Sequence, residues 1–240
     1  MALNKLTVKE IVGRTLREFH SGQTIVLGTG IPEQLAVLSD PAAGFQFISE
    51  NGVNGYISGS DGTDDFGLLN STNGTVLGCP GSSVVSTEEL AAMLRGGHVD
   101  FAVVEPSQID INGSFTHWTT DKSNGIFAPG SALDLTHGCK RTIAIMPHQN
   151  AQGDSNIVQK CDGMVDGVSS VSMIVTDIAV LTVSDDGLKL DEVAPGWSVE
   201  DVRAMTGAPL MINENVKEIE FSQLAESIRS KVCESGLDAV

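Results

Sequence analysis

Glu50 is the residue of this chain whose type and position most directly suggest chemistry. It follows an apolar segment, residues 45–49, that is typical of a short buried strand, and it precedes Asn51-Gly52, a pair that favours turns. A carboxylate at the carboxyl end of such a strand points into the crevice where open α/β sheets bind their ligands. An ordinary surface glutamate at a turn would show the same local pattern, so both interpretations stay open at this point.

Polar or glycine-rich turns follow two further predicted strands. Residues 24–27 lead into Gly28 and Gly30, and residues 101–105 lead toward Gln108. Glycines allow a ligand to approach the backbone closely, and a glutamine amide can donate a hydrogen bond to a carbonyl oxygen. A tight turn without a ligand and a solvated loop glutamine are the alternatives. The third glycine of the dinucleotide-binding fingerprint is missing, so we predict no NAD site here.

The elements that must position these residues alternate along the chain between short apolar strands and amphipathic helices. This alternation predicts an α/β fold with an open, mainly parallel sheet flanked by helices, built as one domain over residues 1–240. Residues 52–83 are rich in Gly, Ser, Asp and Asn and predict a long, weakly structured excursion or a set of turns. Residues 110–130 are expected to be rich in loops. The expected helices cover 7–19, 33–38, 87–95, 198–205 and 222–232, and the remaining strands cover 142–146, 172–175, 178–183 and 189–193.

The charge of the chain excludes several classes of partner. Its formal net charge is −17, from 31 acidic and 14 basic residues. Such a surface repels nucleic acid phosphates and anionic lipid, so we expect no binding to nucleic acid or to membranes. It also opposes the binding of any anion, unless local backbone donors or a partner protein compensate.

The cysteines and histidines show no metal-binding or disulfide pattern. There is no CxxC pair, and we predict neither a metal site nor a permanently bound cofactor. The first ten residues lack the apolar core of a signal peptide, and no apolar stretch is long enough to span a membrane. These features predict reduced cysteines in a cytoplasmic protein. The residues concerned are Cys79, Cys139, Cys161, Cys233, His20, His98, His117, His137 and His148.

Several motifs in order resemble the second (B-type, or β) subunit of class I coenzyme A transferases that act on 3-oxo acids or 3-oxoadipate. Any one of them is weakly specific, but their occurrence in the family's order, from about residue 7 to about residue 220, is a specific signal. The motifs are Leu27-Gly28-Thr29-Gly30-Ile31-Pro32, Ser49-Glu50-Asn51-Gly52, Met93-Leu94-Arg95-Gly96-Gly97-His98-Val99-Asp100, Gln108, Trp118, Gly130-Ser131-Ala132-Leu133-Asp134-Leu135 and Thr176-Asp177-Ile178-Ala179-Val180.

The resemblance implies a coenzyme A transferase fold and a ping-pong reaction through a thioester between Glu50 and coenzyme A. It implies acyl-CoA and a free carboxylic acid as the substrates. Backbone N–H groups of Gly130, Ser131 and Ala132 would form an oxyanion hole. Asn51, Gln108, Gly28 and Gly30 would contact Glu50 or the substrate.

The resemblance further implies an α-type partner subunit, in an α₂β₂ assembly, that supplies coenzyme A contacts. Departures from the family pattern, among them Asn54 and Ser131, surround the expected crevice and leave the acid substrate open: a 3-oxo acid, another short acid or a dicarboxylic acid. Three alternatives remain. The first is a thioester hydrolase on the same scaffold, the second a non-catalytic binding or assembly subunit, and the third, more distant, a sugar-phosphate isomerase of related fold.

Overall fold

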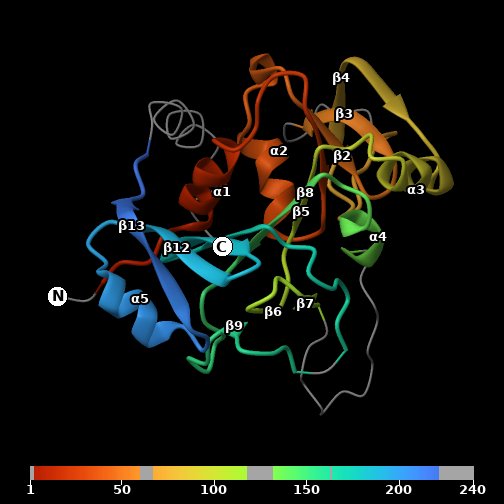
Figure 1. Ribbon diagram of the computed structural model, residues 1–240. Coiled ribbons are helices and arrows are strands. Elements are labelled where there is room, and N and C mark those ends of the chain that lie inside the picture. The colour runs from red at the N-terminus through yellow and green to blue at the C-terminus, as the bar shows by residue number, and fades with distance from the viewer. Residues whose placement is uncertain (1–2, 60–66, 118–131, 163, 222–240) are drawn as a thin grey trace.

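The structure is a computed structural model that describes residues 3–59, 67–117, 132–162 and 164–221 (Figure 1). A ten-stranded sheet runs through it, in the order β13-β12-β11-β10-β8-β5-β1-β2-β3-β4. Five adjacent strands at its centre are parallel. In chain order these are β1 (Thr24–Leu27), β2 (Gln46–Ser49), β5 (Phe101–Val104), β8 (Arg141–Met146) and β10 (Met173–Thr176).

The central strands carry continuous buried runs rather than an alternation of buried and exposed residues, because helices cover both faces of the sheet. All four residues of β5 and of β10 are buried, and so are Ile25, Val26 and Leu27 of β1. The prediction of a parallel α/β sheet from short apolar runs is therefore confirmed.

Antiparallel strands extend the sheet at both ends. On one side β3 (Val53–Ser58) and β4 (Val76–Val84) follow β2. On the other side β11 (Ala179–Ser184) and β12 (Gly187–Val193) form the expected hairpin, and β13 (Leu210–Glu218) runs parallel to β12.

The prediction of a weakly structured segment over 52–83 was wrong, since β3 and most of β4 lie within it. It failed because β4 is an edge strand: eight of its nine residues are not buried, and it contains Pro80, Gly78 and Gly81, so no apolar alternation marks it.

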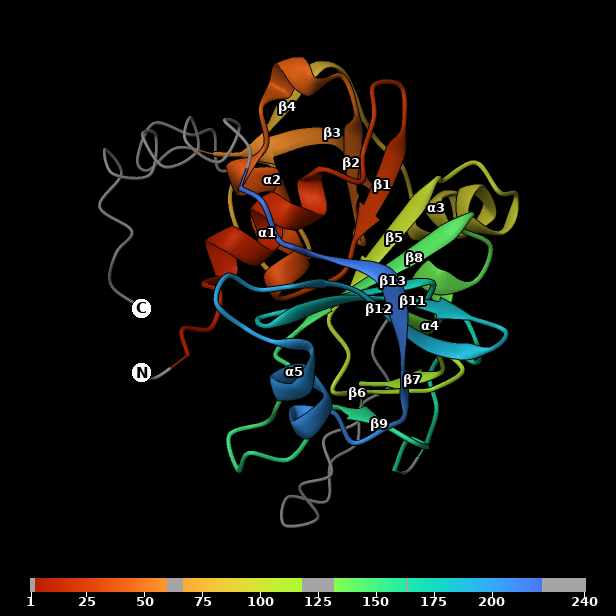
Figure 2. The same cartoon turned by 60° about the vertical axis from the view of Figure 1, so that its left-hand side comes forward.

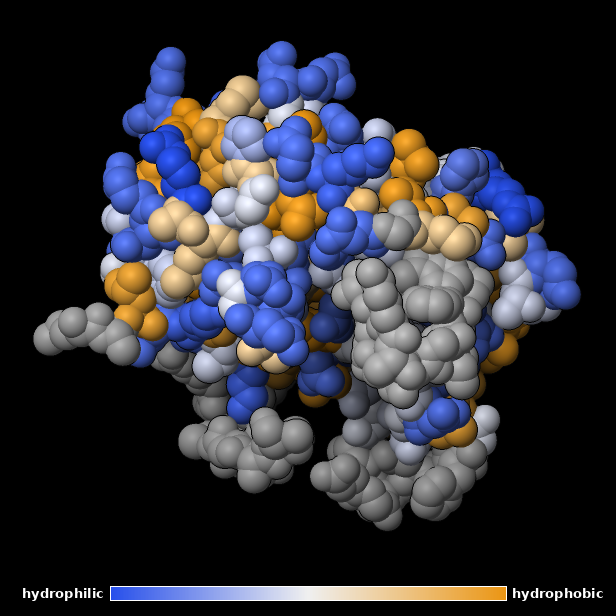
Figure 3. All heavy atoms as spheres, turned by 90° about the horizontal axis from the view of Figure 1, so that it is seen from below, coloured by the Kyte–Doolittle hydropathy of each residue, from blue (hydrophilic) through white to orange (hydrophobic). Residues whose placement is uncertain are grey.

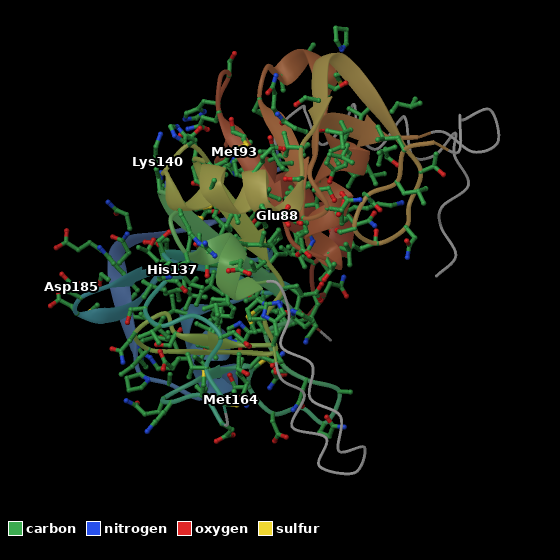
Figure 4. All side chains as sticks on the ribbon, turned by 90° about the vertical axis from the view of Figure 1, so that its right-hand side faces the viewer. Glu88, Met93, His137, Lys140, Met164 and Asp185 are labelled. Atoms are coloured by element: carbon green, nitrogen blue, oxygen red, sulfur yellow. The ribbon has the colours of Figure 1, made fainter. Side chains whose placement is uncertain are left out.

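The described residues form five α-helices. In Figure 2, α1 (Val8–Leu16) and α2 (Gln34–Leu38) lie on one side of the central strands, and α3 (Thr87–Arg95) and α4 (Ala132–Thr136) on the other. Figure 4 shows α3, with Glu88 and Met93, beside the segment after α4 that carries His137 and Lys140. The fifth helix, α5 (Val199–Met205), packs near β13. Two single 3-10 turns, η1 (Ile31–Glu33) and η2 (Pro41–Ala43), complete the helical elements of the described residues.

Capping boxes fix where three helices begin. Thr7, Ser86 and Ser198 each accept a hydrogen bond from the backbone N–H three residues later, and the acidic side chain at that later position bonds back. The helices expected at 7–19, 87–95 and 198–205 are therefore confirmed, although α1 ends at Leu16. The helix expected at 33–38 is confirmed as α2, which η1 precedes. The helix expected at 222–232 lies outside the described residues.

A small second sheet lies beyond the end of β5, at the bottom of Figure 1. It is formed by β6 (Gln108–Asp110), β7 (Phe115–Thr116) and β9 (Ile157–Val158), in the order β7-β6-β9. One of these strands, β7, falls within the stretch 110–130 that we expected to be rich in loops, and β6 ends at the first residue of that stretch.

The buried side chains form one hydrophobic cluster that extends from α1 across the central strands to α5. The face in Figure 3 is largely hydrophilic, with hydrophobic residues scattered between polar ones. None of the helices within the described ranges is long and apolar enough to cross a membrane.

Candidate active site

The carboxyl ends of the parallel strands bring the predicted site residues to one edge of the sheet. Leu27, the last residue of β1, pairs in register with Ser49 of β2 and with Val103 of β5. The residues that follow these strands therefore emerge side by side. Gly28, Glu50 and Glu105 are the first residues beyond the three strands.

Glu50 lies at the tip of a tight turn between β2 and β3. The turn is closed by a hydrogen bond from Gly52 N to Ser49 O of 2.9 Å. Gly52 has a φ of +92°, and a Cβ atom there would collide with the carbonyl oxygen of Val85. Only glycine meets both conditions. The Glu50 side chain is half-buried, so it is held by the fold and still faces solvent.

Gly28 lies directly against the Glu50 carboxylate. A Cβ atom at position 28 would stand 3.5 Å from Glu50 Oε1 and 3.1 Å from Val103 O, whose carbonyl accepts a hydrogen bond of 2.8 Å from Gly28 N. The absent side chain leaves the backbone of the β1 turn open beside the carboxylate. The structure thus brings together two residues that the sequence singled out separately.

Gly30 faces a carboxylate that the sequence analysis did not identify, that of Glu105. A Cβ atom at position 30, where φ is +89°, would collide with Glu105 Oε2, and the same oxygen accepts a hydrogen bond of 2.6 Å from Ile31 N. Burial raises the pKa of Glu105, and the hydrogen bond from Ile31 opposes that shift. Glu105 could not be recognised from its neighbours because it has the pattern of an ordinary polar residue at a strand end.

A second carboxylate missed from the sequence, Glu33, lies behind the Glu50 turn. It is 5% exposed and accepts hydrogen bonds from Tyr56 Oη at 2.8 Å, Ser71 Oγ at 3.0 Å and Asn70 Nδ2 at 3.1 Å. Burial raises its pKa, the three hydrogen bonds lower it, and the negative charge of Glu50 raises it further. Burial beside Glu33 also raises the pKa of Tyr56 far above its usual value, so Tyr56 remains a hydrogen-bond donor.

The two predicted amide side chains bond to the protein in this structure. Asn51 is exposed, and its Nδ2 donates to Leu69 O at 2.7 Å. Gln108 in β6 accepts from Asp162 N at 2.9 Å through Oε1 and donates to Asp162 Oδ2 at 3.5 Å through Nε2. Their roles toward a substrate stay predictions.

Part of the predicted site lies outside the described residues. This holds for Gly130 and Ser131, two of the expected oxyanion donors, and for Trp118. Ala132 is the first residue of α4. Among the described residues, no group of three or more His, Cys, Asp or Glu side chains is arranged to hold a metal ion.

The comparisons with known proteins identify the family of the chain. The family described as coenzyme A transferase matches residues 9–205. The chain belongs to the coenzyme A transferase family. It is 32% identical to the B subunit of succinyl-CoA:3-ketoacid coenzyme A transferase from Helicobacter pylori, over 82% of this chain and 95% of that protein. It is also 32% identical to the B subunit of 3-oxoadipate CoA-transferase from Pseudomonas putida, over 86% of this chain and 97% of that one.

A solved structure confirms the fold of this coenzyme A transferase. The crystal structure of glutaconate coenzyme A-transferase from Acidaminococcus fermentans superposes with a TM-score of 0.70 at 18% identity, over 98% of this chain and 96% of that one. The predicted coenzyme A transferase fold and the assignment of the chain as a transferase of the B-subunit type are therefore both confirmed.

Proposed function

We propose that this transferase subunit moves coenzyme A between an acyl-CoA and a free carboxylic acid, with Glu50 as the covalent carrier. One observation carries the proposal: Glu50 is displayed on a glycine-closed turn at the carboxyl edge of the parallel sheet, with Oε1 against the open backbone at Gly28. A nucleophile needs that combination of fixed position and access.

The proposed reaction conserves an activated acyl group throughout. The ionised carboxylate of Glu50 attacks the thioester carbonyl of the acyl-CoA, the C–S bond breaks, and an acyl–glutamyl anhydride and coenzyme A thiolate result. The thiolate then attacks the glutamyl carbonyl of the anhydride, which forms the glutamyl-CoA thioester and releases the first acid as its carboxylate. A second carboxylate reverses both steps and leaves as the new acyl-CoA. Kinetics of the ping-pong type follow.

Each acyl transfer passes through an oxyanion that needs hydrogen-bond donors. Backbone N–H groups at Gly130, Ser131 and Ala132 are the proposed donors, and one such donor is commonly worth about 3–4 kcal/mol. Asn51, Gln108, Gly28 and Gly30 complete the proposed substrate contacts. A 3-oxo acid, another short acid or a dicarboxylic acid is the proposed substrate class, and it draws support from the names of the relatives.

The proposal includes an A-type partner subunit in an α₂β₂ assembly, because the relatives are named as B subunits. The charge of the chain, −17, supports it as well, because coenzyme A is an anion and three carboxyl groups, those of Glu33, Glu50 and Glu105, lie at this edge of the sheet. A partner that supplies cations would offset that repulsion. A cytoplasmic location is also proposed, supported by the free thiols of Cys79, Cys139 and Cys161.

The test is covalent loading of the intact complex. The chain is co-expressed with its A-type partner and mixed with a panel of acyl-CoAs without an acceptor acid, and the mass of the chain and of its peptides is measured. We expect an adduct of the mass of coenzyme A on the peptide that contains Glu50, and none in Glu50→Gln. Glu88→Gln, a matched change of an exposed glutamate on α3 (Figure 4), should load like the wild type.

Product analysis separates the alternatives. The transferase makes a new acyl-CoA only when a second carboxylate is present, whereas a hydrolase releases free coenzyme A from the acyl-CoA alone. A well-formed complex that gives neither an adduct nor a product from any donor would contradict the proposal in favour of a non-catalytic binding role.

A further inference from the structure

The buried Glu33 carboxylate connects elements that are far apart in the sequence. Its donors come from β3, through Tyr56, and from the segment 69–71, through Asn70 and Ser71. Ser49 Oγ, on the residue before Glu50, lies 3.5 Å from Glu33 Oε1. A nearly buried carboxylate that accepts several hydrogen bonds is a strong local anchor, because each donor would be left unpaired without it.

The segment 69–71 in turn holds both neighbours of Glu50. On the preceding side, Ser71 N donates to Ser49 Oγ at 2.9 Å. On the following side, Asn51 Nδ2 donates to Leu69 O at 2.7 Å. The backbone of Glu50 is therefore fixed from both flanks by the segment that Glu33 anchors.

The segment 69–71 belongs to a loop that hydrogen bonds to Thr72 and Gly74 close. Asn70 Oδ1 accepts from Gly74 N at 2.7 Å and from Thr72 N at 3.1 Å, and Asn70 N donates to Gly74 O at 2.9 Å. Leu69 and Thr75 also form an isolated antiparallel β-bridge. Because these bonds hold the loop together, it is positioned as a unit by its bonds to the rest of the protein. The side chains of Asn70 and Ser71 both bond it to Glu33.

We propose that Glu33 is a positioning residue for the coenzyme A transfer, which acts through the segment 69–71 and Ser49 to hold the Glu50 turn. The inference rests on the proposed function of Glu50 and extends it to a residue that does not touch the substrate. Ser49 Oγ already accepts from Ser71 N, so its own proton is directed toward Glu33 Oε1.

The variant Glu33→Gln tests this role with almost no change of volume. It replaces one acceptor oxygen by a donor NH₂ group. The side chain can then no longer accept hydrogen bonds from all of Tyr56, Asn70 and Ser71. We expect the rate of Glu50 loading to fall about tenfold or more, since even a 1 Å misplacement can cost about 100-fold. The KM for acyl-CoA should change by less than about threefold, because a positioning residue makes no substrate contact.

The matched control is Glu192→Gln, the same change at a carboxylate on β12 that is paired with Arg14 of α1 at 2.7 Å, away from the Glu50 turn. It should weaken folding but load at the wild-type rate. Amide hydrogen exchange gives a readout independent of activity: Gly52 N and Ser71 N, which donate to Ser49, should exchange faster in Glu33→Gln than in Glu192→Gln.

The outcomes separate the two proposals. Wild-type loading and unchanged exchange in Glu33→Gln would overturn the positioning role. If that variant does not fold, Ser71→Ala removes one of the same hydrogen bonds, and wild-type loading with unchanged exchange would overturn the role equally. If the wild-type complex is never loaded, the proposed function fails, and with it the role of Glu33 in transfer. The exchange data then decide separately whether Glu33 holds the turn.

Discussion

Gly52 and Gly153 offer a controlled test of whether the turn geometry matters for activity. Their φ angles are nearly equal, +92° and +88°, so Gly→Ala imposes the same backbone strain at both. A Cβ atom at position 153 has nothing within 4 Å, whereas one at position 52 would overlap the carbonyl oxygen of Val85. The difference between the two variants therefore isolates the collision next to Glu50.

The magnitudes follow from these contacts. A non-glycine residue at positive φ costs about 1–2 kcal/mol, which is the whole effect expected for Gly153→Ala. Gly52→Ala adds the displacement of Val85, whose N–H donates to Gly52 O at 3.0 Å, and a lost hydrogen bond costs about 1 kcal/mol more. We expect Gly52→Ala to be destabilised by about 2–3 kcal/mol.

Urea unfolding measures the stability of both variants, and the loading assay with the A-type partner measures their function. Gly153→Ala should load Glu50 at the wild-type rate. Gly52→Ala should load it at least about tenfold more slowly, because the shift occurs two residues from the proposed nucleophile. Equal loading by the two variants would refute the reasoning that the glycine-closed turn positions Glu50.

Two further predictions concern stability alone. The ring of His148 is fully buried between Thr176 Oγ1 and Thr206 Oγ1, and burial lowers its pKa from about 6.5 to about 4. Between about pH 6.5 and pH 4, His148 is protonated in the unfolded chain but stays neutral in the folded protein. The free energy of unfolding therefore decreases as the pH falls through this range, by up to about 1.4 kcal/mol per pH unit. Urea unfolding of wild type and His148→Gln at pH 7 and pH 5 should show a smaller loss in the variant, and equal losses would contradict it. Ser86→Ala removes the capping box of α3 and should cost about 1 kcal/mol in the same assay, with no effect if the cap is not formed in solution.

The sequence predicted the elements whose signals are local. The capping box at Thr7 indicates α1, and the apolar run 101–104 indicates a central strand. The turn before Gly187 indicates the β11–β12 hairpin. The position of Glu50 at the end of β2 follows from the same local pattern. These signals need no knowledge of distant contacts.

The elements that were missed have no such signal. The edge strand β4 is exposed and interrupted by Pro80, and the edge strand β13, which was not predicted, has no buried residue. Glu33 was predicted only as the start of a helix, because its partners Tyr56, Asn70 and Ser71 lie 23 to 38 residues away. A buried carboxylate is recognisable only when such distant donors are brought together.

The charges at the site bear on why the proposal includes a second, A-type chain. Glu33 and Glu105 flank the β1 and β2 turns, and burial opposes their ionisation. The proposed transfer would create a thiolate and oxyanions near the same edge, and negative charge beside other carboxyl groups is unfavourable in a partly buried site. Backbone donors can stabilise one oxyanion, but the phosphates of coenzyme A add charges that the glycine turns alone would not neutralise. Cations from outside this edge are the simplest compensation, and an A-type partner is where the proposal places them.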